Sequence, residues 1–159
     1  MKKTLMFLVV SVMIFLGCQS ISAEVCWKSP DEMITVTELA IAFIGIPYRY
    51  GGNTLRGIDC SAFVKKIYSM VNVVIPRTTW EQLRIGRKVE KHELTHGDLV
   101  FFRSEKGNHV GIYVGDDKFI HASSRSRKVK IDHLDESYFK RRFIKAVRVR
   151  EVERSDEDE

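Results

Sequence analysis

The sequence predicts an α+β domain in which N-terminal helices pack on an antiparallel sheet. Apolar residues recur at helical spacing in the first half of the chain, and β-rich runs dominate only after residue 98. The absence of βαβ alternation and of a glycine-rich phosphate motif argues against a doubly wound parallel fold. A chain of 159 residues, 44% of them hydrophobic, supports one compact domain with a modest core.

The first 17 residues are typical of an export signal. Lys2 and Lys3 precede an uncharged apolar stretch at 5–16. This stretch is too short for a permanent membrane helix, which needs about 20 apolar residues. We therefore expect residues 1–17 to be a signal peptide that is removed.

The residues that end this stretch predict a lipid anchor. Phe15-Leu16-Gly17-Cys18 resembles the lipobox of bacterial lipoproteins, which implies a lipidated, palmitate-bearing Cys18 as the new N-terminus. An ordinary cut after Ala23 fits less well, because Ile21 stands where a small residue is preferred. Gln19 resembles an outer-membrane sorting residue. We therefore expect the protein to be a membrane-anchored lipoprotein of the cell envelope that faces the periplasm, with the outer membrane favoured over the inner.

Composition divides the remaining chain into three parts. Residues 18–34 form the lipidated N-terminus and a linker, 35–150 form the folded domain, and the acidic residues 151–159 form a disordered tail. The chain carries a net charge of +5. Because the tail is acidic, the folded part alone is more positive than this value. An exported basic domain is expected to meet an anionic wall polymer or lipid headgroups and no nucleic acid.

Three helices are predicted before the sheet. The first spans 35–44, and the second begins at Cys60 with Asp59 as its N-cap. A short third helix follows Pro76 and ends before Gly86. The glycine-rich stretch at 47–58 is predicted to be an irregular loop that lines a site.

The second half predicts an antiparallel meander. β-rich runs occur at 99–102, 110–114, 119–121 and 129–131, separated by turn residues. A short helix at 135–143 and a last strand at 144–149 complete the domain.

Cys60 stands where a nucleophilic thiol is expected. The N-terminus of a helix stabilises a thiolate and can lower the thiol pKa from about 8.5 into the range of roughly 3.5 to 7.5. Cys18 is assigned to lipid, and Cys26 lies in the linker without CxxC spacing. A disulfide between Cys26 and Cys60 is the alternative, and it would silence the nucleophile.

The base is expected among the five histidines. His109 opens one predicted strand and His121 closes the next, so a three-residue turn at 115–117 would put both on one face of the hairpin. Gly111 lies on the same face, which predicts space there for the N-terminus of the cysteine helix. The other three histidines lie in polar, loop-like stretches.

Several motifs in register resemble the NlpC/P60 family of cysteine peptidases. They are Tyr48-Arg49-Tyr50-Gly51-Gly52, Gly57-Ile58-Asp59-Cys60-Ser61, Gly97-Asp98-Leu99-Val100-Phe101-Phe102, His109-Val110-Gly111-Ile112-Tyr113 and His121-Ala122-Ser123. The resemblance runs from about residue 39 to 149 and is greatest with the small murein endopeptidase lipoproteins of that family. It implies a reduced papain-like fold.

The resemblance also implies roles for single residues. Cys60 would be the nucleophile, His109 the base and His121 the residue that orients it. Tyr48 would bind the oxyanion. Asp59 and Ser61 occupy positions at which family members recognise a free amine of the substrate peptide. The chain departs from the pattern at Ala62, where glycine is usual.

The activity implied is hydrolysis of amide bonds in peptidoglycan stem peptides, at the cross-link from D-alanine to diaminopimelate. The bond from γ-D-glutamate to diaminopimelate is an alternative, as are acyl transfer or amidase action on lipid or another amide and a catalytically silent wall-binding lipoprotein. Cys60, His109 and His121 could also form a zinc site, although the expected mechanism needs no metal and no cofactor. The expected partners are stem peptides and, through Cys18, a lipid membrane; a regulatory protein is left open.

Overall fold

The computed structural model describes residues 35–105 and 107–149. The predicted signal peptide, the lipidated cysteine with its linker, and the acidic tail lie outside these residues. No helix in the described part of the chain is long and apolar enough to cross a membrane.

The first two predicted helices are confirmed, and side chains cap both. Helix α2 (Val36–Ala42) starts after Thr35, which forms a reciprocal capping box with Glu38. Helix α3 (Cys60–Ser69) starts after Asp59, whose Oδ1 accepts a hydrogen bond from the Ala62 N–H at 2.8 Å. The aspartate cap therefore fixes Cys60 as the first residue of the helix.

Two stretches differ from the prediction. The segment at 47–58 is not wholly irregular, because β1 (Asn53–Thr54) and β2 (Gly57–Ile58) form a small antiparallel ribbon. Helix α4 (Thr79–Gln82) is shorter than predicted, with Leu83 as its C-cap. The chain then turns at Gly86, with φ +70°, into the unpredicted strand β3 (Arg87–Val89). A 3₁₀ turn, η1 (Lys91–Glu93), follows.

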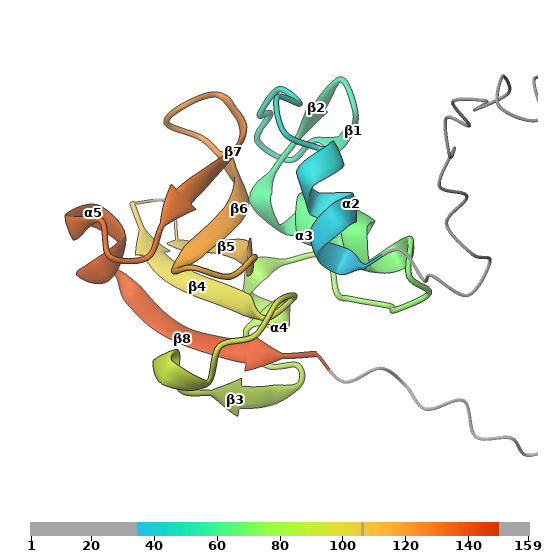
Figure 1. Ribbon diagram of the computed structural model, residues 1–159. Coiled ribbons are helices and arrows are strands. Elements are labelled where there is room, and N and C mark those ends of the chain that lie inside the picture. Colours follow the sequence, from blue (N-terminus) through green and yellow to red (C-terminus); the bar gives the residue numbers. More distant parts are fainter. Residues whose placement is uncertain (1–34, 106, 150–159) are drawn as a thin grey trace, which may run out of the picture. The chain divides into compact units, whose positions relative to one another are not determined.

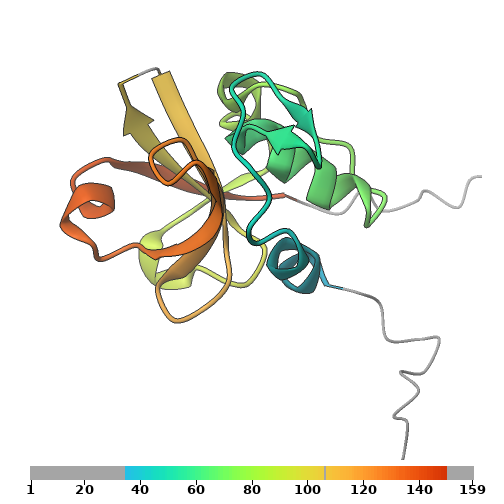
Figure 2. The same cartoon turned by 90° about the horizontal axis from the view of Figure 1, so that it is seen from above.

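The main sheet contains the predicted meander. Its strands are β4 (Leu99–Ser104), β5 (Gly107–Tyr113), β6 (Lys118–Ser123) and β7 (Lys128–His133), followed after helix α5 (Ser137–Lys140) by β8 (Phe143–Arg148). Within the described residues the sheet order is β3-β8-β4-β5-β6-β7, and all pairs are antiparallel. The last strand thus returns to pair with β4, while α2 and α3 lie on one side of the sheet and α5 on the other (Figures 1 and 2). The α+β prediction is confirmed.

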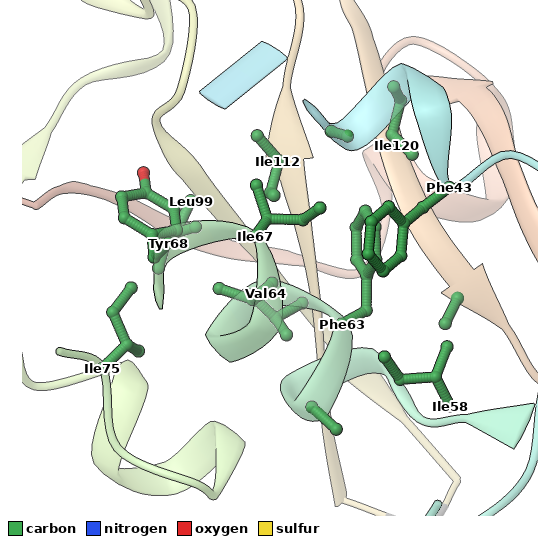
Figure 3. Close-up of a cluster of buried hydrophobic side chains, with 14 of the residues drawn as sticks. Phe43, Ile58, Phe63, Val64, Ile67, Tyr68, Ile75, Leu99, Ile112 and Ile120 are labelled. Atoms are coloured by element: carbon green, nitrogen blue, oxygen red, sulfur yellow. The ribbon is translucent and has the colours of Figure 1, made fainter. Parts of the chain in front are cut away.

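Alternating side chains give the sheet two apolar faces. On β4, Leu99 and Phe101 join the cluster under α3, whereas Val100 and Phe102 join a second cluster with Phe139 of α5. Figure 3 shows the first cluster, where the side chains of α3 point at those of the sheet. Its labelled members are Phe43, Ile58, Phe63, Val64, Ile67, Tyr68, Ile75, Leu99, Ile112 and Ile120. This packing holds the helix that carries Cys60 against the sheet.

The predicted histidine hairpin has the expected register. Tyr113 pairs with Phe119, the Val114 N–H donates to the Lys118 carbonyl at 2.9 Å, and residues 115–117 all have positive φ. The turn therefore has three residues, and its glycine and two aspartates are types that tolerate this conformation.

The prediction that Gly111 leaves space for the cysteine helix is wrong. Helix α3 packs on the opposite face of the hairpin, against Val110, Ile112 and Ile120. A Cβ at Gly111 would lie 2.6 Å from Cδ2 of Phe119 and 3.0 Å from the carbonyl oxygen of Ile120. The glycine thus admits the phenyl ring of the neighbouring strand, and not the cysteine helix.

Candidate active site

Strands β5 and β6 separate where the candidate catalytic residues lie. The two strands pair at Ile112/Ile120 and Tyr113/Phe119, while β5 remains paired with β4 as far as Ser104/Gly107. Beyond this divergence the Val110 N–H points away from β4 and donates to the sulfur of Cys60. The thiol therefore lies at the edge of β5, beside the residue that follows His109.

The two histidines form a hydrogen-bonded pair on the other face of the hairpin. Nε2 of His109 lies 2.6 Å from Nδ1 of His121, with the rings nearly perpendicular at 83°. His109 is partly exposed, whereas His121 is 2% exposed and packs between Phe119 and Phe139. The structure thus brings together the base and the orienting residue that the resemblance implied.

Tyr48 is held beside the cysteine by backbone contacts on both sides. Its N–H donates to the Arg127 carbonyl at 2.8 Å, and it forms a bridge with Ile58, two residues before Cys60. Burial, together with the nearby Cys60 and Asp59, raises the pKa of Tyr48 above its usual value. The phenol is therefore neutral and able to donate a hydrogen bond.

Asp59 and Ser61 are joined by Arg77, which the sequence analysis did not single out. The Arg77 guanidinium donates to both carboxylate oxygens of Asp59, at 3.1 and 2.6 Å, and to the Ser61 hydroxyl at 2.8 Å. Nearby, the buried Gln82 donates to the Ser61 carbonyl at 2.9 Å. The first turn of α3 is thus clamped by residues 77–82, and the Asp59 charge is already paired.

Burial decides the protonation states of the thiol and the imidazole. It raises the pKa of Cys60 to about 11, although the Val110 N–H lowers it. Burial and the adjacent His121 lower the pKa of His109 to about 3, against the opposing effect of Asp132. The predicted depression of the thiol pKa is therefore not found, because desolvation outweighs the helix N-terminus. At neutral pH Cys60 is therefore a thiol and His109 a neutral imidazole, which is the form able to accept a proton.

The zinc alternative finds no support in this arrangement. His121 uses both ring nitrogens, one toward His109 and the other toward Asp132 at 2.8 Å. Across residues 35–105 and 107–149, no three His, Cys, Asp or Glu side chains are grouped so that they could hold a metal ion. Cys60 is a free thiol.

Acid should destabilise the fold through the two histidines. Burial is the main cause that lowers both pKa values in the folded state, so below the unfolded value of about 6.5 the unfolded chain binds protons that the folded chain does not. The free energy of unfolding should therefore fall as the pH drops below 6.5, with a slope that approaches about 1.4 kcal/mol per pH unit for His109 and a further contribution of the same sign from His121. Urea denaturation at pH 7, 6 and 5 measures this. His109→Gln should flatten the slope, and an unchanged unfolding free energy in the parent would refute the lowered pKa values of the two histidines.

Arg77 and Asp132 lie at the site but were not predicted from the sequence, for different reasons. Arg77 lies 18 residues from Asp59 in a stretch without regular structure, so no periodicity connects them. Asp132 could have been found, because the β6–β7 register places Lys130 opposite His121 and Asp132 opposite Phe119, on the same face. Strand alternation across the β6–β7 hairpin is enough to predict this position.

Comparison with known proteins agrees with this geometry. The profile of the NlpC/P60 family matches residues 45–148. The chain is 49% identical over 108 residues to the probable endopeptidase NlpC homolog of Haemophilus influenzae, covering 67% of this chain and 57% of that protein. It is 44% identical over 107 residues to the murein DD-endopeptidase MepS/murein LD-carboxypeptidase of Escherichia coli K12, covering 66% and 56%.

A solved structure also resembles this chain in fold and sequence. The NlpC/P60 family protein from Bacillus cereus ATCC 10987 superposes with a TM-score of 0.66 at 34% identity, covering 72% of this chain and 40% of that one. The chain spans a little over half the length of the two curated relatives. On the family match and the fold together, the chain belongs to the NlpC/P60 family.

Proposed function

We propose that this protein hydrolyses amide bonds in peptidoglycan stem peptides, with Cys60 as the nucleophile, His109 as the base and His121 as the residue that orients it. The observation that carries the proposal is that the Val110 N–H holds the Cys60 thiol beside the residue that follows His109, while the His109 ring is hydrogen-bonded to His121. The relationship to a protein named as a murein endopeptidase supports the choice of substrate.

The reaction follows from these positions. His109 takes the thiol proton as the Cys60 sulfur attacks the carbonyl carbon of the scissile amide. The oxyanion of the tetrahedral intermediate would accept hydrogen bonds from the Cys60 N–H and the Tyr48 hydroxyl. As the C–N bond breaks, His109 returns its proton to the leaving amine and a thioester remains on Cys60. Water, deprotonated by His109, then hydrolyses the thioester and regenerates the thiol.

The preferred bond in this proposal is the cross-link from D-alanine to diaminopimelate. Asp59 and Ser61 would border the substrate, but Arg77 already neutralises the Asp59 carboxylate through a 2.6 Å ion pair. A free substrate amine would have to displace this guanidinium. A substrate without such an amine, such as the interior of a cross-linked wall, faces no such competition.

The location proposed for this activity is the cell envelope. Cys18 would carry the lipid and hold the domain at a membrane facing the periplasm, with the outer membrane favoured by Gln19. Both residues lie outside the described part of the chain, so the motif alone supports this step.

Digestion of isolated sacculi tests the function. The purified full-length chain is incubated with sacculi, and the muropeptides are then released and identified by mass spectrometry. A conversion of cross-linked dimers to monomers is expected. Shortened monomer stems would move the cut to the γ-D-glutamyl bond. Unchanged muropeptides with protein bound to the wall would favour a silent binder, and release of acyl groups from labelled lipid in a parallel reaction would favour an acyltransferase or amidase.

A further inference from the structure

The hydrogen bonding at the site continues beyond His109 and His121 to a third side chain. Nε2 of His121 lies 2.8 Å from Oδ2 of Asp132, and the Lys130 ammonium pairs with the other carboxylate oxygen. Asp132 is 8% exposed, and β7 carries it on the face that His121 occupies on β6. Three side chains from three strands thus form one row, from His109 through His121 to Asp132.

The carboxylate fixes where every proton in this row lies. An ionised carboxylate only accepts hydrogen bonds, so Nε2 of His121 must carry a proton. Neutral His121 then has a lone pair on Nδ1, and the 2.6 Å contact requires Nε2 of His109 to be the donor. Neutral His109 consequently has its lone pair on Nδ1, the nitrogen that points away from His121.

The surroundings keep Asp132 ionised. Although burial raises the pKa, hydrogen bonds from His121 and Lys130 hold the pKa of Asp132 below its usual value. The other charges that act on His121 are those of Lys130 and Glu136. Lys130 is paired with Asp132 itself, so the carboxylate is the group that accepts from His121.

We propose that Asp132 is a positioning residue for the proposed peptidase: by accepting from His121 it sets the tautomers of both imidazoles, so that His109 presents Nδ1 as the base. The proposal rests on the proposed function for its catalytic consequence, but the tautomers themselves are a property of the free protein. When His109 is protonated during attack, the same row stabilises the imidazolium through His121.

Asp132→Asn reverses the row without removing its hydrogen bonds. Because the Lys130 ammonium only donates, the asparagine is expected to keep its amide oxygen toward Lys130 and its NH2 group toward Nε2 of His121. The His121 proton then moves to Nδ1, which becomes the donor to Nε2 of His109. His109 then carries its proton on Nδ1 and cannot accept one from the thiol. We expect kcat to fall by up to about 10⁴-fold with little change in KM, which is the loss that a tautomer error causes in the analogous Ser-His-Asp triad.

Nitrogen NMR of the histidines in the full chain separates this role from a structural one. In the parent, both histidines should show the Nε2–H tautomer, and in Asp132→Asn both should change to Nδ1–H. Asp132→Glu should restore the parental tautomers and part of the activity. Lys130→Gln, which keeps the carboxylate, should leave the tautomers unchanged. A parental His109 with Nδ1–H, or full activity in Asp132→Asn, would overturn the proposal. If the parent proves inactive on sacculi, the tautomer result still stands and only the proposed function fails.

Discussion

Cys60→Ala is expected to abolish turnover of cross-linked muropeptides, with kcat falling at least a thousandfold. The thiol is the attacking atom in the proposed mechanism, and loss of a nucleophile in comparable triads removes nearly all catalysis beyond that of binding and the oxyanion site. Release of monomers from a purified cross-linked dimer, followed by chromatography, measures the effect. The fold should persist, because the Asp59 cap and the packing of Phe63, Val64 and Ile67 do not depend on the sulfur.

Two controls isolate the chemical role of Cys60. Cys26→Ala should keep full activity, since that cysteine is predicted to lie idle in the linker. Binding of Cys60→Ala to sacculi in a pull-down should equal that of the parent, because substrate binding does not use the thiol. Hydrolysis by Cys60→Ala at a rate near that of the parent would contradict the nucleophile assignment, whatever bond is cut.

His109→Gln is expected to cause a loss of similar size. Glutamine keeps a polar side chain near Nε2 of the histidine but provides no nitrogen that takes a proton at neutral pH, so the thiol would keep its proton. Because burial already raises the pKa of Cys60 to about 11, little thiolate forms without the base. The double variant with Cys60→Ala should be no worse than either single one, since the two residues act as a unit.

The matched control for this variant is His133→Gln. His133 is an exposed histidine at the end of β7, and its removal should change neither kcat nor KM. Equal losses in His133→Gln and His109→Gln would mean that the effect of the second is not specific to the site. Retention of most activity in His109→Gln would require another base.

The sequence predicted those features that depend on local pattern. The capped start of α3 at Cys60 followed from Asp59, and the shared face of His109 and His121 followed from a three-residue turn and strand alternation. These features were predictable because N-caps and strand parity involve neighbours in sequence. Strand β3 was missed since it is short, carries Arg87 and Lys88, and owes its existence to pairing with β8.

Tertiary packing accounts for what the sequence could not predict. The space at Gly111 is filled by Phe119, and α3 lies on the other face, which strand parity alone does not specify. The pairing of Arg77 with Asp59 joins segments without a common element. The thiol pKa was expected to be low from the helix N-terminus alone, but desolvation of the thiol raises the pKa by more than the helix N-terminus lowers it.

Capture of the acyl group on Cys60 tests directly whether this thiol is the nucleophile. The full-length protein is mixed with a cross-linked muropeptide dimer, quenched in acid at successive times, and examined by intact-protein and peptide mass spectrometry. We expect a transient mass increase equal to that of the acyl half of the substrate, located on the peptide that contains Cys60 and absent from Cys60→Ala. Substrate turnover by a protein whose Cys60 has first been fully alkylated with iodoacetamide, with no adduct at any time, would contradict it.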